Sequence, residues 1–335
     1  MTSAQKRRLN ESLEAYGYLA PAGIILIIFW FLPVIASLAI SFGNMSALQP
    51  LDQMRFVGLE QYGRALASRD FQQTLWNTVN YVLYSVPTTL VLALAAALLL
   101  NAQVRGRGFF RVAYFLPYIT TWVAISIVFS YLFHREYGLA NWLLGVVSVD
   151  LLGKETPWRL EWLSEPRGIW EMLFGVNVPP LPFGINNMLE GPSLSSFCII
   201  LTSVWRDVGY FMVIFLAGLQ NIDRSMYEAA SIDGANNVQK FKAITFPLLS
   251  PVTYFLLVIS MINAFKVFVP QFMMTPQGGP DRTTMPITMY LYLEGFTGEW
   301  KLSYASAVAY LLTIIILTLT LIQNRIFGKR VEYGQ

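Results

Sequence analysis

The stretch Asp223–Ser250 reads DRSMYEAASIDGANNVQKFKAITFPLLS and has an apolar run on each side, at residues 195–219 and 251–273. A helix needs about 20 apolar residues to cross roughly 30 Å of hydrocarbon, because each residue adds about 1.5 Å. Both runs reach that length. The stretch is therefore predicted to be a polar loop between two membrane spans.

The order of residues within this loop predicts a helical hairpin. Met226–Ile232 is compatible with one short helix, and Asp233-Gly234 is a strong turn signal. Asn236 or Asn237 can cap a second helix, which must end near Pro247.

The same loop has features of a docking surface. Its small residues Ala229, Ala230 and Ala235 permit close approach of another protein, while Glu228 and Asp233 offer hydrogen-bond acceptors to it. A short amphipathic helix that only contacts the bilayer is the alternative interpretation.

Four further apolar runs indicate an all-α integral membrane protein with about six transmembrane helices. Of the 335 residues, 55% are hydrophobic and 13% are charged, about half the charge of a typical soluble domain. The expected spans are 19–42, 74–100, 112–133, 195–219, 251–273 and 303–327. The first follows a basic stretch, but its apolar part is too long for a signal peptide, so it is expected to remain as an anchor.

The distribution of Lys and Arg predicts the orientation of these spans. With the N-terminus inside, the cytoplasmic segments hold about 12 basic residues in roughly 67 positions, against about 9 in roughly 120 outside. Residues 1–18, the loop 223–250 and the tail 328–335 are thus expected to be cytoplasmic, and the loop 135–194 external. The net charge of +3 suits anionic lipids and gives no reason to expect a nucleic-acid partner.

The composition offers little for catalysis or metal binding. The single cysteine, Cys198, lies in an apolar run and the single histidine, His134, ends the third span. Neither has the neighbours that a zinc site or a Ser-His-Asp triad would need. The sequence therefore predicts no metal site and no enzyme activity.

Three charged residues lie inside the expected spans, at Arg206, Asp207 and Lys266. Charges at such depth are costly and are functional candidates by default. Adjacent helix positions point about 100° apart, so Arg206 and Asp207 are not expected to neutralise each other.

Polar and aromatic side chains share faces with these charges. Asp207 shares a face with Tyr210 and Phe211, and Asn263 shares one with Lys266. A carboxylate, a phenol, an amide and aromatic rings together suit a polyhydroxylated ligand. Pairing between helices or with another membrane subunit is the alternative.

The loop carries about ten positions that match a known motif in order and spacing. They are Glu228-Ala229-Ala230, Asp233-Gly234-Ala235, Phe241, Ile244, Pro247-Leu248 and Pro251. This pattern resembles the EAA loop of permease subunits in ATP-binding-cassette importers, most closely the maltose-type carbohydrate importers. Segments on both sides are also similar to that family: Phe56–Tyr62, Gly138–Asn141, Trp162–Pro166, Leu216–Gln220 and Gly278-Gly279-Pro280.

Three departures from the family pattern stand out. Phe246 replaces the usual leucine before the first proline, and Pro276 is extra before the Gly-Gly-Pro turn. Roughly Arg167 to Pro192 looks inserted, so the resemblance implies no role for that segment.

The resemblance implies that the loop is a coupling-helix hairpin seated in a cleft of an ATPase. The coupling residues would be Glu228, Ala229, Ala230, Asp233, Gly234, Ala235 and Pro247. It also implies that the substrate path runs along spans four and five. Arg206 and Lys266 are candidates there by their charge, and the family pattern places further residues at or near the lining: Asp207, Tyr210, Asn263, Ala264 and Val267.

The chain contains no G-x-x-x-x-G-K-[ST] phosphate loop, so ATP and Mg²⁺ are expected on partner subunits and no cofactor on this chain. The implied partners are a second permease, forming a heterodimeric core, two ATP-binding subunits and a periplasmic or lipid-anchored solute-binding protein. The implied location is the bacterial inner membrane. A secondary transporter would need intramembrane coupling carboxylates or broken helices repeated in two halves, and it is the main competing class. A permease for a non-carbohydrate solute is the next alternative.

Overall fold

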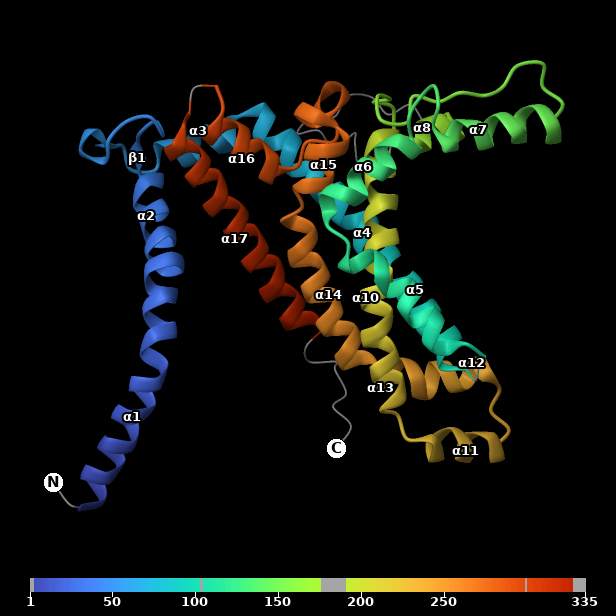
Figure 1. The fold of residues 1–335 in the computed structure, drawn as a ribbon, viewed down its shortest axis with the longest axis horizontal. Coiled ribbons are helices and arrows are strands. Elements are labelled where there is room, and N and C mark those ends of the chain that lie inside the picture. Colours follow the sequence, from blue (N-terminus) through green and yellow to red (C-terminus); the bar gives the residue numbers. More distant parts are fainter. Residues whose placement is uncertain (1–2, 103–104, 176–190, 299, 328–335) are drawn as a thin grey trace. The chain divides into compact units, whose positions relative to one another are not determined.

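The computed structural model describes residues 3–102, 105–175, 191–298 and 300–327. In these ranges the chain is mostly helical, as predicted. It divides into two compact units, one made of Met1–Leu66 with Leu291–Leu311 and the other of Ala67–Tyr290 with Leu312–Gln335. Figure 1 shows the order of the helices along the chain.

In the first unit, the expected first span is part of a longer helix. α1 (Ser3–Leu26) runs through a π-helical turn at Ile27–Phe31 into α2 (Leu32–Ser41). Of this helix, Glu14–Ser41 is long and apolar enough to cross a membrane. The predicted N-terminal segment 1–18 is thus largely helical rather than separate from the span.

After α2, the chain of the first unit continues with short elements. β1 (Gly43–Asn44) pairs antiparallel with β2 (Arg55–Phe56) around a 3₁₀ turn at Leu51–Gln53, and α3 (Glu60–Ala67) follows. α3 buries Gln61 and Ala65.

In the second unit, two long helices form the core. α4 (Arg69–Asn101) and α10 (Leu194–Gln220) pack along each other, and they include the apolar runs at 74–100 and 195–219. Ala93 and Ala97 of α4 are fully buried, and such small side chains let two helix backbones approach closely. α5 (Arg107–Ile119) packs against α10, and α14 (Ser250–Phe265) packs against α4.

The expected third span is not one helix, which corrects the prediction for residues 112–133. α5 (Arg107–Ile119) and α6 (Trp122–Leu132) meet at a bend of 97°. Thr120 and Thr121 have extended backbones, and the Thr121 hydroxyl accepts a hydrogen bond from the Ala124 N–H at the start of α6. A run of apolar residues does not reveal such a break, because the pattern of hydrophobicity continues across it.

The expected fifth span also differs from the prediction. α14 (Ser250–Phe265) ends eight residues before the predicted end at Met273, and α15 (Val269–Met274) is a separate short helix. Pro270 lies in the first turn of α15, where its missing N–H is tolerated. At its other end α14 meets the helical segment Asn237–Leu248 at a bend of 63°.

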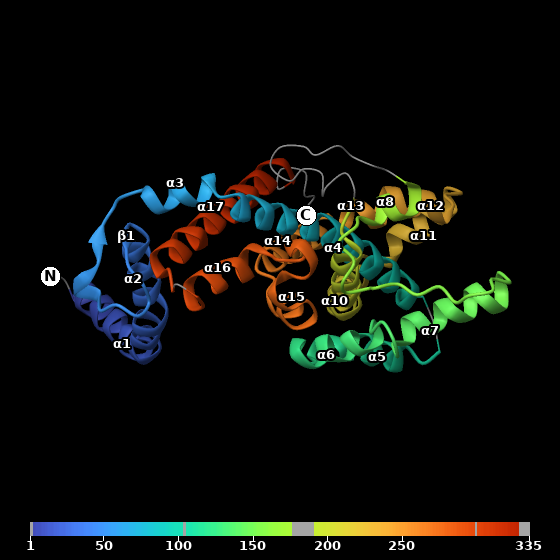
Figure 2. The same cartoon turned by 90° about the horizontal axis from the view of Figure 1, so that it is seen from above.

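The loop 135–194 contains helices of its own. α7 (Leu139–Val146) continues into a π-helical turn at Val147–Leu151, and Figures 1 and 2 show it extending away from the α4–α10 pair. α8 (Ile169–Phe174) follows, and a bridge between Gly168 and Ser193 closes the base of the segment. Most of the insertion expected at 167–192 lies outside the described residues, as does the predicted tail 328–335.

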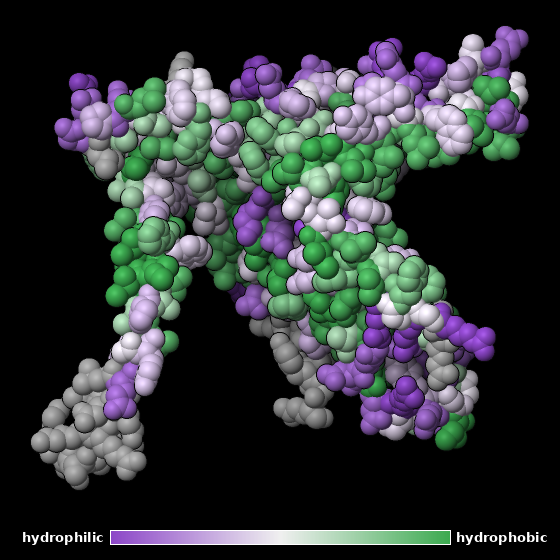
Figure 3. All heavy atoms as spheres, viewed as in Figure 1, coloured by the Kyte–Doolittle hydropathy of each residue, from purple (hydrophilic) through white to green (hydrophobic). Residues whose placement is uncertain are grey.

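The C-terminal part begins with tight turns at Pro276–Gly278 and Pro280–Arg282. α16 (Ile287–Phe296) and α17 (Leu302–Phe327) follow, and α17 matches the predicted span 303–327. In the described residues, four helices are long and apolar enough to cross a membrane, or up to six if each bent pair counts as one span. Figure 3 shows hydrophobic side chains over the middle of the second unit and hydrophilic ones at its two ends.

Candidate functional site

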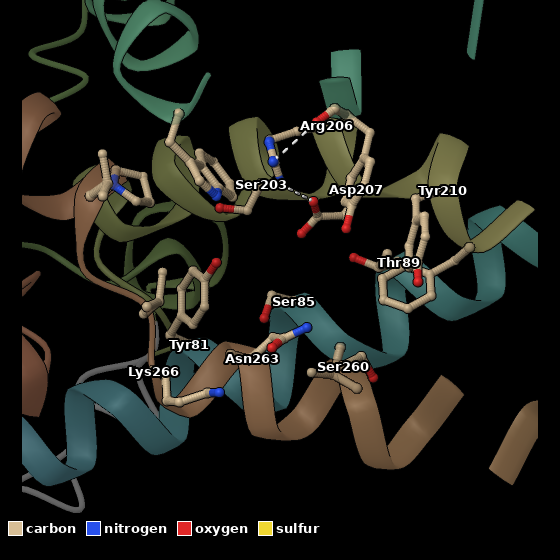
Figure 4. A pocket seen from close by; sticks show the side chains of 18 of the residues that line it. Tyr81, Ser85, Thr89, Ser203, Arg206, Asp207, Tyr210, Ser260, Asn263 and Lys266 are labelled. Atoms are coloured by element: carbon tan, nitrogen blue, oxygen red, sulfur yellow. Dashed lines mark hydrogen bonds and ion pairs between the residues drawn. The ribbon is translucent and has the colours of Figure 1, made fainter. Parts of the chain in front are cut away.

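A cavity of about 360 Å³ lies among the helices of the second unit. Four segments line it, namely α4, the α5–α6 junction, α10 and the end of α14 with the residues after it. We call it the central pocket. All seven predicted pathway residues line it: Arg206, Asp207, Tyr210, Asn263, Ala264, Lys266 and Val267. Figure 4 shows ten of its polar side chains converging from α4, α10 and α14.

Arg206 and Asp207 form an ion pair in the wall of this pocket, contrary to the prediction. Arg206 Nη1 donates to Asp207 Oδ1 at 2.7 Å, and the two side chains are 14% and 27% exposed. The helix does point the two Cβ atoms apart, but the arginine side chain is long enough to reach back across that angle. A tightly bonded pair inside the membrane avoids much of the cost of about 2.5–3.5 kcal/mol that insertion scales assign to each lone charge.

Aromatic rings at the α5–α6 junction hold the guanidinium in place. Arg206 Cζ lies 4.7 Å from the ring centroid of Tyr118 and 4.2 Å from that of Trp122, and Arg206 Nη2 donates to the Tyr118 carbonyl at 3.1 Å. Stacking of a cation on two rings supports it electrostatically. The break between α5 and α6 thus brings both rings to the pocket.

Tyr210 presents an aromatic face beside the charged pair. Its ring stacks on Tyr118 with centroids 4.3 Å apart and planes at 10°. The expectation that Asp207 and Tyr210 share one face agrees with their common position on the pocket wall.

The α4 side of the pocket carries polar residues that the sequence analysis did not single out. Tyr81, Ser85 and Thr89 are buried and line the cavity opposite α10. They follow each other at intervals of four residues, which places them on one helix face. A polar stripe at this spacing within an apolar run was the signal that could have found them.

The hairpin Asp223–Ser250, here called the docking hairpin, lies at the end of the α4–α10 pair opposite α6, α8 and α15 (Figure 1). Its first arm is α11 (Arg224–Ile232), capped by Asp223 through a hydrogen bond of 2.9 Å from the Ser225 N–H. That bond lowers the pKa of the Asp223 carboxyl. The capping group is therefore ionised at neutral pH.

The turn and the second arm follow the predicted signals. Gly234 adopts φ of 78°, the left-handed conformation in which a residue without Cβ is favoured. Asn236 forms a capping box with Gln239, and α12 (Asn237–Lys240), a π-helical turn at Phe241–Thr245 and α13 (Phe246–Leu248) continue the arm.

Contacts between its arms hold the docking hairpin in shape. The Tyr227 and Thr245 hydroxyls lie 2.9 Å apart, and Lys240 Nζ donates to the Ser231 hydroxyl at 2.7 Å. The outer surface of the hairpin remains open: Ile232 is 87% exposed, and most predicted coupling residues are exposed too, namely Glu228, Ala229, Asp233 and Gly234. Ala230, Ala235 and Pro247 are half-buried.

The single cysteine and the single histidine, which were considered for catalysis and metal binding, both contact other residues of the fold. Cys198 is buried and its thiol lies 3.6 Å from the Trp162 carbonyl, while His134 stacks on Tyr137 with centroids 3.6 Å apart. Across the described part of the chain, no group of three or more His, Cys, Asp or Glu side chains could hold a metal ion.

Comparison with known proteins places the chain in a family. Residues 63–333 match the family described as "binding-protein-dependent transport system inner membrane component". The arabinooligosaccharides transport system permease protein AraP of Bacillus subtilis (strain 168) is 30% identical over 322 residues, which cover 96% of this chain and 90% of that protein. The sn-glycerol-3-phosphate transport system permease protein UgpA of Salmonella typhi is 28% identical and covers 95% of each chain.

A solved structure shares the fold. One chain of a bacterial alginate ABC transporter, in complex with an alginate pentasaccharide-bound periplasmic protein, matches with a TM-score of 0.76 and 19% identity. The match covers 98% of this chain and 99% of that one. The chain therefore belongs to the family of multi-pass inner membrane components of binding-protein-dependent transport systems.

Proposed function

We propose that this chain is the permease subunit of an ATP-binding-cassette importer and forms the translocation path for a sugar, glycoside or polyol. The observation that carries the substrate class is the central pocket. It combines a carboxylate, hydroxyl groups and an amide with the aromatic ring of Tyr210. Hydroxyl groups of a sugar exchange hydrogen bonds with such side chains, and its apolar face packs on a ring.

The relatives support this substrate class but leave the charge of the solute open. AraP is named for arabinooligosaccharides and UgpA for sn-glycerol-3-phosphate. A neutral oligosaccharide and a charged polyol are both consistent with that pair of names.

The proposed assembly is a second permease, two ATP-binding subunits that carry ATP and Mg²⁺, and an external solute-binding protein. Both termini and the docking hairpin would face the cytoplasm. The exposed acids and small residues of the hairpin then offer the ATP-binding subunit a surface that it can approach closely.

Two helical segments that meet at a bend connect the docking hairpin to the central pocket. Residues Asn237–Leu248 join α14 at a bend of 63°, and the far end of α14 places Asn263 and Ala264 in the pocket lining. A tilt of the hairpin would therefore move the α14 wall of the pocket, as alternating access to the two sides of the membrane requires.

Affinity purification of the tagged chain from native membranes in mild detergent tests this assembly. We expect mass spectrometry to identify a P-loop ATPase and a second multispanning protein. Both should still co-purify with the Asp281→Ala variant, which changes an exposed turn. The Glu228→Lys variant should recover less of the ATPase. Recovery of the chain alone, where a known importer stays intact, would contradict the proposal and favour a self-contained transporter.

A further inference from the structure

The central pocket carries three charged side chains, and two of them neutralise each other. Its described lining contains Arg206, Asp207 and Lys266 and no other charged residue. The ion pair of 2.7 Å joins the first two, and the rings of Tyr118 and Trp122 cover the guanidinium. The pocket is left with one positive charge, on Lys266.

Lys266 stands apart from the charged pair. It ends α14, and Figure 4 shows its ammonium on the side of the pocket opposite Arg206 and Asp207, next to Asn263. The residue is exposed and lines the pocket, and it makes no ion pair with any other residue that the structure describes.

The helix terminus explains only part of this arrangement. A cation is favoured at the C-terminal end of a helix because the backbone carbonyls carry partial negative charge there. That effect acts close to the backbone. It does not account for the ammonium lining the pocket beside the Asn263 amide, which together offer hydrogen-bond donors to a ligand.

We propose that the central pocket takes a sugar or polyol bearing one anionic group, a carboxylate, sulfonate or phosphate, and that Lys266 is the residue that selects it. This inference rests on the proposed transport function and narrows its substrate. The Lys266 ammonium binds the anion through charge-assisted hydrogen bonds, and the neighbouring Asn263 amide donates to it. Asp207 and the hydroxyls of Tyr81, Ser85 and Thr89 bind the hydroxyl groups of the same solute.

The test uses the purified importer complex without its binding protein, so that binding reports on the membrane pocket. Radiolabelled D-glucuronate and glucose 6-phosphate are compared with D-glucose by equilibrium binding in nanodiscs of phosphatidylcholine. We expect at least one anionic sugar to bind at least tenfold more tightly than glucose. Lys266→Gln should remove that preference and change glucose binding less than twofold.

Two further variants separate a selecting role from a structural one. Lys266→Arg keeps the charge and should keep most of the preference, whereas Lys154→Gln removes a lysine outside the pocket and should change nothing. An equal loss of binding affinity for all three sugars in Lys266→Gln, with the complex still assembled, would overturn the selecting role. So would a wild-type complex that binds glucose as tightly as both anions.

A lipid phosphate has the same chemistry and is distinguished by the nanodisc. If anionic phosphatidylglycerol in the disc abolishes glucuronate and glucose 6-phosphate binding, Lys266 is a lipid site and the inference fails. If an assembled complex binds and transports neutral sugars only, this inference fails while the transport function stands. If the chain assembles with no ATPase, the transport function fails first and takes this inference with it.

Discussion

The docking hairpin and the central pocket are built in opposite ways. The hairpin is one continuous segment whose turn, caps and cross-contacts all come from residues 223–250. The pocket takes its lining from segments as distant as Tyr81 and Lys266. A site made from one segment can be recognised in a sequence, whereas a site made from several depends on how helices pack.

The two regions also differ in what surrounds them. The outer surface of the docking hairpin is open, with Glu228 and Ile232 exposed, so a substitution there changes what the hairpin binds more than how the chain folds. In the pocket, Ser85 and Thr89 are buried and contribute to packing as well as to the lining. The following variants test that contrast.

Glu228→Lys should have the largest functional effect. The exposed carboxylate becomes a cation at the proposed docking surface. If that surface binds donor groups of an ATP-binding subunit, as proposed, like charges would then meet. We expect transport to be abolished while the protein stays in the membrane at its normal level. Uptake of radiolabelled solute by cells, with immunoblotting of the membrane fraction, measures both. Normal uptake would refute the coupling role.

Gly209→Ala should have the largest effect on stability. A Cβ at Gly209 would lie 1.7 Å from the Tyr114 carbonyl oxygen, so α5 must move away from α10. We expect a loss of about 3 kcal/mol, at the upper end for overpacking, and release of the Tyr118–Tyr210 stack from the pocket. Thermal unfolding in detergent measures it. Gly145→Ala on α7 is the matched control, since its nearest atom lies at an ordinary 3.5 Å.

Asp207→Ala should act on ligand binding more than on assembly. Removing the carboxylate leaves Arg206 without its partner and takes an acceptor from the pocket wall. We expect solute affinity to change by about tenfold, equivalent to about 1.4 kcal/mol, with the subunits still purified together. Asp70→Ala, which breaks the exposed ion pair with Arg282, serves as control. Loss of assembly in Asp207→Ala alone would show that the pair is a packing element.

Asn236→Ala should have the smallest effect. It removes the capping box of the second arm, which costs about 1 kcal/mol. Because α12, the first part of that arm, is short and mostly exposed, we expect faster hydrogen exchange confined to 237–248 and a modest decrease in coupling. Asn236→Ser keeps the capping oxygen and should exchange at the native rate. Equal exchange in both variants would mean that contacts with α11, such as the Tyr227–Thr245 pair, hold the arm without its cap.

The accuracy of the sequence-based predictions follows the same contrast. The hairpin signals from Asp233 to Pro247 were local and were confirmed in the structure. The long helices α4, α10 and α17 were predicted because hydrocarbon thickness requires a minimum apolar length. The bend at Thr120-Thr121 was missed, because residues on both sides of it are apolar.

The sequence by itself determined that the chain is a helical membrane protein, where its polar hairpin lies and that Arg206 and Asp207 stand inside a span. It also placed Lys266 inside a span, whereas the structure has that residue at the C-cap of α14. These follow from composition, run length and short-range turn chemistry. Only the tertiary structure decided that Arg206 bonds to its neighbour Asp207, and that Tyr81, Ser85 and Thr89 line the pocket opposite α10. It also decided that Lys266 makes no ion pair among the described residues. Those outcomes depend on side-chain reach and on which helix faces meet, and neither is encoded in the spacing of residues along one helix.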